Sequence, residues 1–225
     1  MRGRKVEKPE LVLTEDGSHT LRHQSLKELY HSHYGAIQES QHVFIQEGLN
    51  HLNLEKVKIL EVGFGSGLNA LLTALEANER KQIDYLGLDK YPIKEEFWKK
   101  LNYPKLIEDE RAKSTFQKIC EAEWDEPGSI NPNFILEKRE VDFFKYRAHR
   151  LNDVIYFDAF APTIQPDLWE PEILNEMFKS LRRGGILVTY CSKGSFQRNL
   201  KACGFRLEKI PGPPGKREMI RAYRP

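Results

Sequence analysis

The chain has 225 residues, 40% of them hydrophobic and 30% charged, with a net charge of +2 at pH 7. This length fits one domain with a sizeable core, and no stretch of the sequence approaches a transmembrane span. Residues 1–10 are charged and lack the apolar centre of a signal peptide. The three cysteines (Cys120, Cys191 and Cys203) lack metal-ligand spacing. They indicate reduced thiols, so we expect a cytoplasmic protein with no membrane association and no metal.

The charges are distributed unevenly along the chain. Residues 182–225 contain eleven Lys or Arg and two acids, a balance of +9, which leaves −7 for residues 1–181. A basic end on an acidic body suggests an anionic partner, and nucleic acid is the obvious candidate. Solvated surface lysines and arginines explain the charge equally well, so charge alone leaves both interpretations open.

Strands and helices alternate along the chain, which predicts an α/β fold doubly wound around a mostly parallel, seven-stranded sheet. We expect an N-terminal extension at 1–50, packed on a single domain at 51–225. The extension should hold a hairpin and then a helical stretch, and an acidic helical insert should separate the second and third strands of the domain. The expected hairpin is 11–22, the helical segments are 25–50, 68–78, 92–130, 170–182 and 194–202, and the strands are 57–62, 83–89, 134–138, 153–158, 186–191, 205–210 and 218–223.

A glycine loop follows the first strand of this domain. The strand ends at Glu61 and Val62, three alternate glycines follow, and a helical pattern begins at Leu68. Glycine permits positive φ and has no Cβ to hinder a ligand, although a glycine-rich turn without a ligand is the alternative. A dinucleotide fingerprint would need its third glycine at Leu68, so the spacing favours an S-adenosylmethionine site. The cofactor-binding residues predicted here are Glu61, Gly63, Phe64, Gly65, Gly67 and Asn69.

Acids stand at the ends of the next two strands. Asp89 ends the second strand and suits a grip on ribose hydroxyls. Asp142, after the third strand, could accept from the adenine amine while Phe143 stacks on the ring. Each acid taken singly is more often a surface or capping residue. Their combination with the glycine loop favours a ligand site in a class I, Rossmann-like methyltransferase fold.

Asp158 ends the fourth strand, directly after an apolar run, so it should lie beside the methyl donor. Methyl transfer from a sulfonium needs a nucleophile with a free lone pair, and an alkylamine with a pKa of ~10.4 is almost wholly protonated at pH 7. A carboxylate in an apolar setting can orient the amine and accept its proton. We predict Asp158 as the catalytic residue. Its alternative role is to cap a following turn.

The chain resembles the tRNA 5-aminomethyl-2-thiouridine methyltransferases, which exist as stand-alone MnmD proteins and as one half of bifunctional MnmC. The resemblance covers nearly the whole chain. The G-x-G-x-G pattern is weakly specific, whereas the segments around Asp158 and at the C-terminal end are far more specific. The matching segments are Gly35 to Ser40, Val43 to Ile45, Glu61 to Asn69, Asp158 to Pro162, Pro166 to Trp169 and Gly212 to Met219.

The resemblance implies S-adenosylmethionine as the cofactor and 5-aminomethyl-(2-thio)uridine at the tRNA wobble position as the substrate. It implies that Asp158 lies at the target amine, that Phe160 and Pro162 shape the base pocket, and that Glu39 closes the site. Bifunctional relatives continue into a flavin oxidase domain, so we expect no flavin here and a separate enzyme that makes the aminomethyl group. This chain has Thr163 to Gln165 where relatives often carry a lysine.

Basic and aromatic side chains extend this picture to the RNA. The anticodon stem-loop should be held through its phosphates by cations such as Lys216 and Arg217, and Phe160 or Trp169 could stack on the wobble base. Two other functions remain open. An aminopropyl transferase shares this sheet and its strand-four acid but acts on a polyamine. A non-catalytic RNA-binding module could retain the fold without the chemistry.

Overall fold

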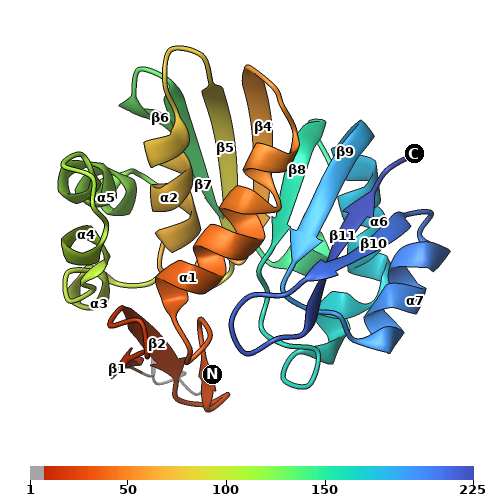
Figure 1. Cartoon of the computed structure of the whole chain (residues 1–225), viewed down its shortest axis with the longest axis horizontal. Helices are drawn as coiled ribbons and strands as arrows, with labels where there is room; N and C mark the ends of the chain where they lie inside the picture. The colour runs from red at the N-terminus through yellow and green to blue at the C-terminus, as the bar shows by residue number, and fades with distance from the viewer. Residues whose placement is uncertain (1–7) are drawn as a thin grey trace, which may run out of the picture.

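The computed structural model describes residues 8–225 and is built around an eight-stranded sheet (Figure 1). The strands of this sheet are β4 (Lys56–Val62), β5 (Gln82–Asp89), β6 (Pro127–Asn131), β7 (Phe134–Glu140), β8 (Asn152–Phe157), β9 (Leu181–Thr189), β10 (Arg206–Pro211) and β11 (Glu218–Tyr223). Their spatial order is β10-β11-β9-β8-β4-β5-β7-β6. Strands β9, β8, β4, β5 and β7 are parallel, and β11, β10 and β6 add antiparallel edges. The predicted α/β class and mostly parallel sheet are confirmed.

The chain changes direction across the sheet between β4 and β8. From β4 it winds outward through β5 to β7, and then returns to place β8 on the other side of β4. Ligands of open α/β sheets bind outside the carboxyl ends of the strands at such a switch point. The backbones meet closely here, since a Cβ on Gly63 would collide with the carbonyl of Asp158. The glycine loop and Asp158 are therefore neighbours.

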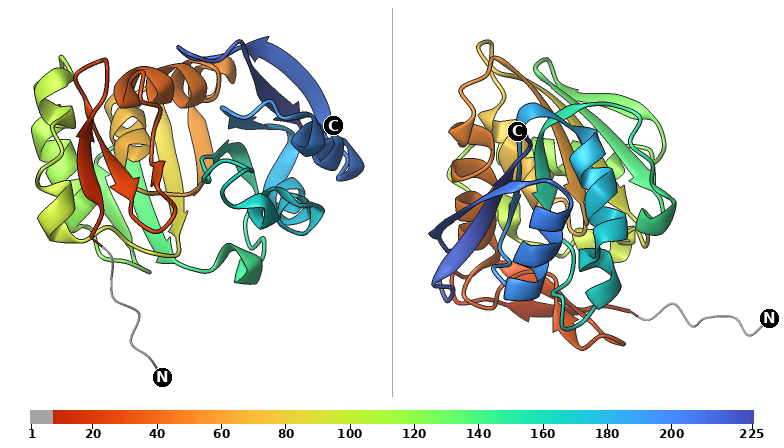
Figure 2. Two further views of the ribbon diagram at one scale, coloured as in Figure 1. Left: turned by 90° about the horizontal axis from the view of Figure 1, so that it is seen from below. Right: turned by 90° about the vertical axis from the view of Figure 1, so that its right-hand side faces the viewer.

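Helices cover both faces of the sheet and define two apolar cores (Figures 1 and 2). One face carries α1 (Ala36–Ser40), its continuation η1 (Gln41–Gln46), α2 (Leu68–Glu76) and α5 (Ala112–Glu121). The other face carries α6 (Pro171–Ser180) and α7 (Gly194–Ala202). Strands with both faces covered should be apolar on both sides, and all six residues of β8 are buried.

The N-terminal segment forms a small antiparallel sheet of β1 (Glu10–Leu13), β2 (His19–His23) and β3 (Glu28–Leu29). The predicted hairpin is confirmed, but the helix predicted for 25–50 begins only at Ala36. Residues before it are tied to β2 instead, because the Tyr30 amide donates to the Leu21 carbonyl at 2.9 Å and the His31 amide to Thr20 Oγ1 at 3.1 Å. Figure 1 shows this sheet below the lower edge of the main sheet. The helical part has buried Val43, Phe44 and Ile45 and lies in the first core.

The segment 92–130 is helical only in part. It contains α3 (Glu95–Trp98), α4 (Tyr103–Leu106) and α5, but it ends in β6, the eighth strand. The prediction of a helical insert is borne out by α3, α4 and α5, but the prediction of seven strands is wrong because β6 is an eighth strand. Pro127 and Gly128 do not alternate with apolar residues, and Ile130 alone in β6 is buried. Pairing with β7, not local pattern, makes this edge strand.

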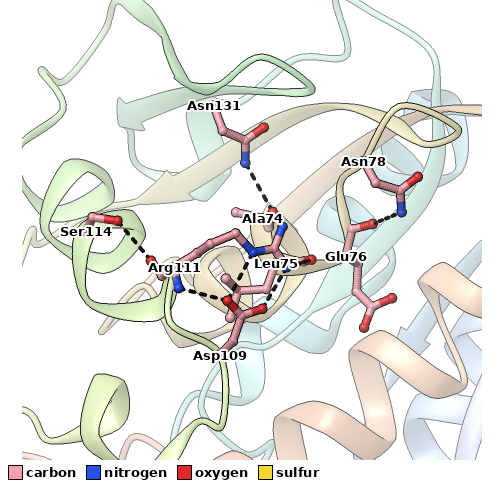
Figure 3. Close-up of polar contacts among 8 residues, drawn as sticks. All are labelled: Ala74, Leu75, Glu76, Asn78, Asp109, Arg111, Ser114 and Asn131. Carbon is pink, nitrogen blue, oxygen red and sulfur yellow. Dashed lines mark hydrogen bonds and ion pairs between the residues drawn. The ribbon is translucent and has the colours of Figure 1, made fainter.

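Side chains from the insert and from the segments beside it cap the helix that follows the glycine loop (Figure 3). The last carbonyls of a helix lack partners within the helix. In α2, the Leu75 carbonyl accepts from Arg111 at 2.9 Å, the Ala74 carbonyl from Asn131 at 3.2 Å, and the Glu76 carbonyl from Asn78 at 3.0 Å. Asp109 holds the Arg111 guanidinium through Oδ2 at 2.6 Å. A cation at the C-terminal end of a helix also interacts favourably with the helix dipole.

Candidate functional site

A cavity of about 770 Å³ lies beyond the carboxyl ends of the parallel strands, between the main sheet and the N-terminal sheet. Its lining includes the glycine loop, the ends of β5, β7 and β8, and most of residues 22–33. The volume suits a nucleoside-sized ligand together with a second group. The cavity therefore brings together segments that lie more than a hundred residues apart in the chain.

The glycine loop has the conformation that its sequence predicts. Gly63, Gly65 and Gly67 have φ of 93°, 52° and 75°, a region that L side chains rarely adopt. Gly63 and Gly65 line the cavity, whereas Gly67 lies outside it and starts α2. The loop thus presents bare backbone to the cavity, as the close approach of a cofactor requires.

Phe64 anchors this loop to the sheet and the insert. Its ring lies over Gly87, where a Cβ would collide with it, and meets Trp124 edge-on at 5.9 Å. The Lys138 ammonium lies 5.9 Å from the Phe64 ring and 5.1 Å from the Trp124 ring. Burial lowers the pKa of Lys138, whose Nζ donates to the Ile119 carbonyl at 2.9 Å. The Lys138 ammonium and the Phe64 and Trp124 rings therefore fix the glycine loop against the sheet and the insert.

Acidic residues at the ends of β5 and β7 line another part of the cavity. Asp89 Oδ2 accepts from the Gly65 amide and Oδ1 from the Tyr91 amide, each at 2.8 Å. Burial raises the pKa of Asp89, although these backbone donors lower it. A carboxylate has about four lone-pair sites, so Asp89 retains the capacity to accept from a ligand hydroxyl. The residues present therefore fit the ribose of S-adenosylmethionine.

Asp142 and Phe143 lie at the same end of the cavity. Asp142 caps the short helix η3 (Phe143–Lys145) through the Phe144 amide at 3.2 Å and pairs with Lys90 Nζ at 2.6 Å. The Lys90 hydrogen bond lowers the pKa of Asp142. An adenine amine would share this carboxylate with Lys90. The half-buried Phe143 ring lies where stacking on a base is possible.

Asn69 links two carboxyl groups beneath the loop. Its Nδ2 donates to Glu61 Oε1 at 2.8 Å and to Asp158 Oδ2 at 2.9 Å. Glu61 is fully buried and does not line the cavity, and burial raises its pKa well above the usual value. Glu61 therefore acts on the site through Asn69. The amide in turn fixes the orientation of Asp158.

The Asp158 carboxyl is the most perturbed acid that faces the cavity. Burial and then the nearby Glu39 carboxylate raise its pKa to about 7, although Asn69 and Lys216 lower it. Glu39 accepts from Lys216 Nζ at 2.6 Å and from the Ser32 amide at 2.7 Å. Lys216 Nζ also lies 3.8 Å from the ring centroid of Tyr190. A carboxyl with a pKa near 7 can exchange a proton at physiological pH.

The remaining predicted residues are divided between two hollows and the core. Phe160 lines the main cavity, and Pro162 and Arg217 line a second hollow of about 700 Å³ that shares Lys216 with it. Trp169, in the short helix η4 (Pro166–Trp169), lies in neither hollow. It is 2% exposed, and its Nε1 donates to the Phe160 carbonyl at 2.8 Å. Trp169 supports the loop that carries Phe160, and its buried ring is not exposed for stacking on a base.

Sequence reasoning missed two groups of cavity residues. Tyr190, at the end of β9, donates from its hydroxyl to the Ala159 carbonyl at 2.7 Å and packs beside Lys216. His23 and Tyr30 reach the cavity from the N-terminal sheet. The rule that ligands lie at the carboxyl ends of strands identifies Tyr190. No local pattern indicates His23 or Tyr30, because their position depends on how the small sheet docks.

The described part of the chain holds no group of three or more His, Cys, Asp or Glu side chains arranged to bind a metal ion. Within residues 8–225, no helix is both long enough and apolar enough to span a bilayer.

Comparison with known proteins points to one enzyme class. Residues 140–225 match the model of a family described as an S-adenosyl-L-methionine-dependent methyltransferase. The bifunctional protein MnmC of tRNA 5-methylaminomethyl-2-thiouridine biosynthesis is 29% identical over 212 residues in Leptospira interrogans and 27% identical over 218 residues in Ralstonia nicotianae. These alignments cover 86% and 88% of this chain but only 32% of each relative.

The crystal structure of MNMC2 from Aquifex aeolicus superposes with a TM-score of 0.77 at 24% identity, covering 98% of this chain and 72% of that one. This similarity confirms the predicted doubly wound α/β fold. The family match bears out the predicted enzyme class and its cofactor class. The resemblance drawn from the sequence motifs is likewise confirmed, over about a third of the length of the bifunctional relatives.

Proposed function

We propose that this chain, similar to the methyltransferase part of MnmC proteins, methylates the amine of 5-aminomethyl-(2-thio)uridine at the tRNA wobble position. The product is 5-methylaminomethyl-(2-thio)uridine. The observation that carries the proposal is the Asp158 carboxyl, whose pKa is raised to about 7. It lies between the glycine loop and the part of the cavity lined by Phe160, which we call the acceptor side because the amine would bind there.

The cofactor, when bound, supplies an electrophilic methyl group. The protein must present the amine with a free lone pair, and three pH units of deprotonation cost about 4 kcal/mol. Asp158 Oδ2 is held by Asn69, so the carboxylate is oriented before the amine arrives. It accepts the amine proton while Glu39 adds negative charge that favours entry of a cation. The glycine loop and Asp89 would hold the donor at one end of the cavity, so that donor and amine meet within one site.

Charge around the second hollow supports an RNA substrate. Lys216 and Arg217 line it, and Lys216 connects it to the main cavity. We propose that this surface contacts phosphates of the anticodon stem-loop, with Pro162 and Phe160 next to the target base. The proposal includes a cytoplasmic location, an upstream enzyme that makes the aminomethyl group, and no need for a flavin or a metal.

Methyl transfer to tRNA tests this function directly. The protein is incubated with labelled S-adenosylmethionine and tRNA from cells that lack the activity, and the labelled nucleoside is identified by mass. We expect methylation of the aminomethyl nucleoside and a loss of about 10²–10⁴-fold in kcat for Asp158→Ala. Glu55→Gln, an exposed change before β4, is the matched control and should retain wild-type activity.

Other results of this assay would contradict the proposal. Label transferred to putrescine from a decarboxylated donor would favour an aminopropyl transferase. Tight RNA binding with no transfer at all would favour a non-catalytic binding module. Methylation at another nucleotide would retain the enzyme class and overturn the substrate.

A further inference from the structure

The N-terminal sheet contributes an aromatic cluster to the acceptor side of the cavity. His23 ends β2, Tyr30 follows β3, and both line the cavity together with Phe160. The Tyr30 and Phe160 ring centroids lie 5.2 Å apart at 79°, and those of His23 and Phe160 lie 5.9 Å apart at 87°. Phe160 thus meets two rings edge-to-face, the arrangement that aromatic pairs prefer. The cluster joins the N-terminal sheet to the loop that carries Asp158.

Tyr30 lies at the boundary between the donor and acceptor halves of the cavity. Its ring packs on the glycine loop, since a Cβ on Gly65 would lie 3.3 Å from Tyr30 Cδ1. Burial and then the Asp89 carboxylate raise the pKa of Tyr30, so its hydroxyl remains a neutral donor. On its other side the ring contacts Phe160. A residue that touches both the cofactor loop and the acceptor wall can set the distance between donor and acceptor.

His23 presents a hydrogen-bond donor to the part of the cavity where the methyl acceptor would bind. Its Nδ1 accepts from the Leu26 amide at 3.3 Å, which places the proton of the neutral ring on Nε2. The ring is half-buried and belongs to the cavity lining. A pyrimidine base has carbonyl or thiocarbonyl acceptors on its edge, and the Nε2–H group suits them. His23 therefore combines an apolar ring contact with one directional donor.

The small sheet is held rigidly enough to position these rings. Asn102 of the insert accepts from the His19 amide at 2.7 Å and donates to the Gly17 carbonyl at 2.9 Å. Thr14 Oγ1 donates to the Ser18 carbonyl at 2.8 Å, which closes the turn between β1 and β2. Buried His31, whose pKa burial lowers to about 4, stays neutral against Thr20. The docked sheet is a preformed wall and not a loose tail.

We infer that Tyr30, His23 and Phe160 form an aromatic wall of the cavity, here called the slot, against which a flipped-out pyrimidine base of a single-stranded RNA loop packs. This inference rests on the proposed function and assigns base recognition to the N-terminal sheet. RNA-modifying enzymes reach a base by taking it out of the stack and holding it between apolar or aromatic side chains. A flexible polyamine has no planar group to fill such a slot. Asp158, two residues before Phe160, lines the same cavity.

Binding to paired RNAs tests the slot. One stem-loop carries 5-aminomethyluridine at the wobble position, and the other has an abasic site there. Fluorescence anisotropy gives the Kd of each RNA, and the ratio of the two reports contact with the base alone. Stacking on one aromatic ring contributes about 1–3 kcal/mol per base, so we expect the wild-type ratio to fall by about tenfold in Tyr30→Leu and in His23→Ala. Tyr30→Phe should retain most of the ratio.

Controls separate a slot from a structural role. His149→Ala, an exposed histidine outside both hollows, should leave the ratio unchanged. Each variant is checked by its thermal unfolding midpoint and by calorimetric binding of S-adenosylhomocysteine. His23 does not touch the glycine loop, so cofactor affinity should be unchanged in His23→Ala while the KM for the stem-loop rises.

Two different failures are distinguishable. If the wild-type protein discriminates between the two RNAs and methylates neither, the proposed function fails while the slot stands. The slot is overturned if the wild-type protein methylates the stem-loop but Tyr30→Leu and His23→Ala raise the Kd of both RNAs by the same factor. It is also overturned if these variants leave both Kd values unchanged.

Discussion

At the scale of single residues, the structure places Asp158 in a charge network with Glu39 and Lys216. Asp158 is near enough to Glu39 and Lys216 for both to act on its pKa, in opposite directions. The sequence predicted each of these residues separately. Their coupling was not predictable, because Glu39 and Lys216 are 177 residues apart in the chain and meet only when the N-terminal helix and the C-terminal hairpin pack together.

The pH profile of the reaction should report this network. Asp158 must be deprotonated to accept a proton, so kcat/KM should rise with pH through about 7. In Lys216→Met the cation that lowers the Asp158 pKa is lost, and the rise should move to higher pH. In Glu39→Gln the anion that raises it is lost, and the rise should move to lower pH. Shifts in the same direction for both variants would contradict the network.

At the scale of elements, the insert after β5 supports the cofactor loop. Trp124 packs on Phe64, Tyr103 donates to Ser66 Oγ at 3.1 Å, and Arg111 caps α2. Its acidic, helical pattern predicted only that helices separate the second and third strands of the domain. The bracing contacts were not predictable from that pattern, since they depend on which face of each short helix docks against the loop.

Gly87→Ala tests how Phe64 and the insert support the glycine loop. The new Cβ would collide with Phe64 Cδ2, so the ring and the glycine loop must move. Overpacking of this kind costs about 1–3 kcal/mol of unfolding free energy, and we expect weaker binding of S-adenosylhomocysteine in calorimetry. Phe64→Leu in the same chain makes space and should restore part of both losses. Gly128→Ala, with open space around its Cβ, is the control and should bind as wild type.

The cap on α2 gives a second test at this scale. Arg111→Met removes the donor to the Leu75 carbonyl and the cation at the helix end. We expect a loss of about 1 kcal/mol in urea unfolding, because a capping interaction contributes about that amount. Lys113→Met, exposed on the adjoining α5, should change stability by less than about 0.5 kcal/mol. Equal losses in the two variants would count against the cap.

At the scale of the whole molecule, the basic C-terminal part meets the acidic body at the two hollows. Binding through phosphates releases counterions, so the affinity for a stem-loop should fall steeply as salt is raised. Arg217→Gln should weaken all RNAs alike and reduce the slope of log K against log salt by about 1. Lys56→Gln, exposed at the amino end of β4, should leave the slope unchanged. A flat salt response of the wild-type protein would contradict phosphate contacts.

The sequence by itself determined the α/β class, the parallel strands, the glycine loop and the strand-end acids, because periodicity and glycine spacing are local properties of the chain. The assignment of residues 1–50 as an extension on a domain at 51–225 stays a prediction. Only the tertiary structure decided the edge strand β6, the burial of Trp169 and the entry of Tyr30 and His23 into the cavity. Each of these depends on contacts between distant segments, which local patterns do not encode.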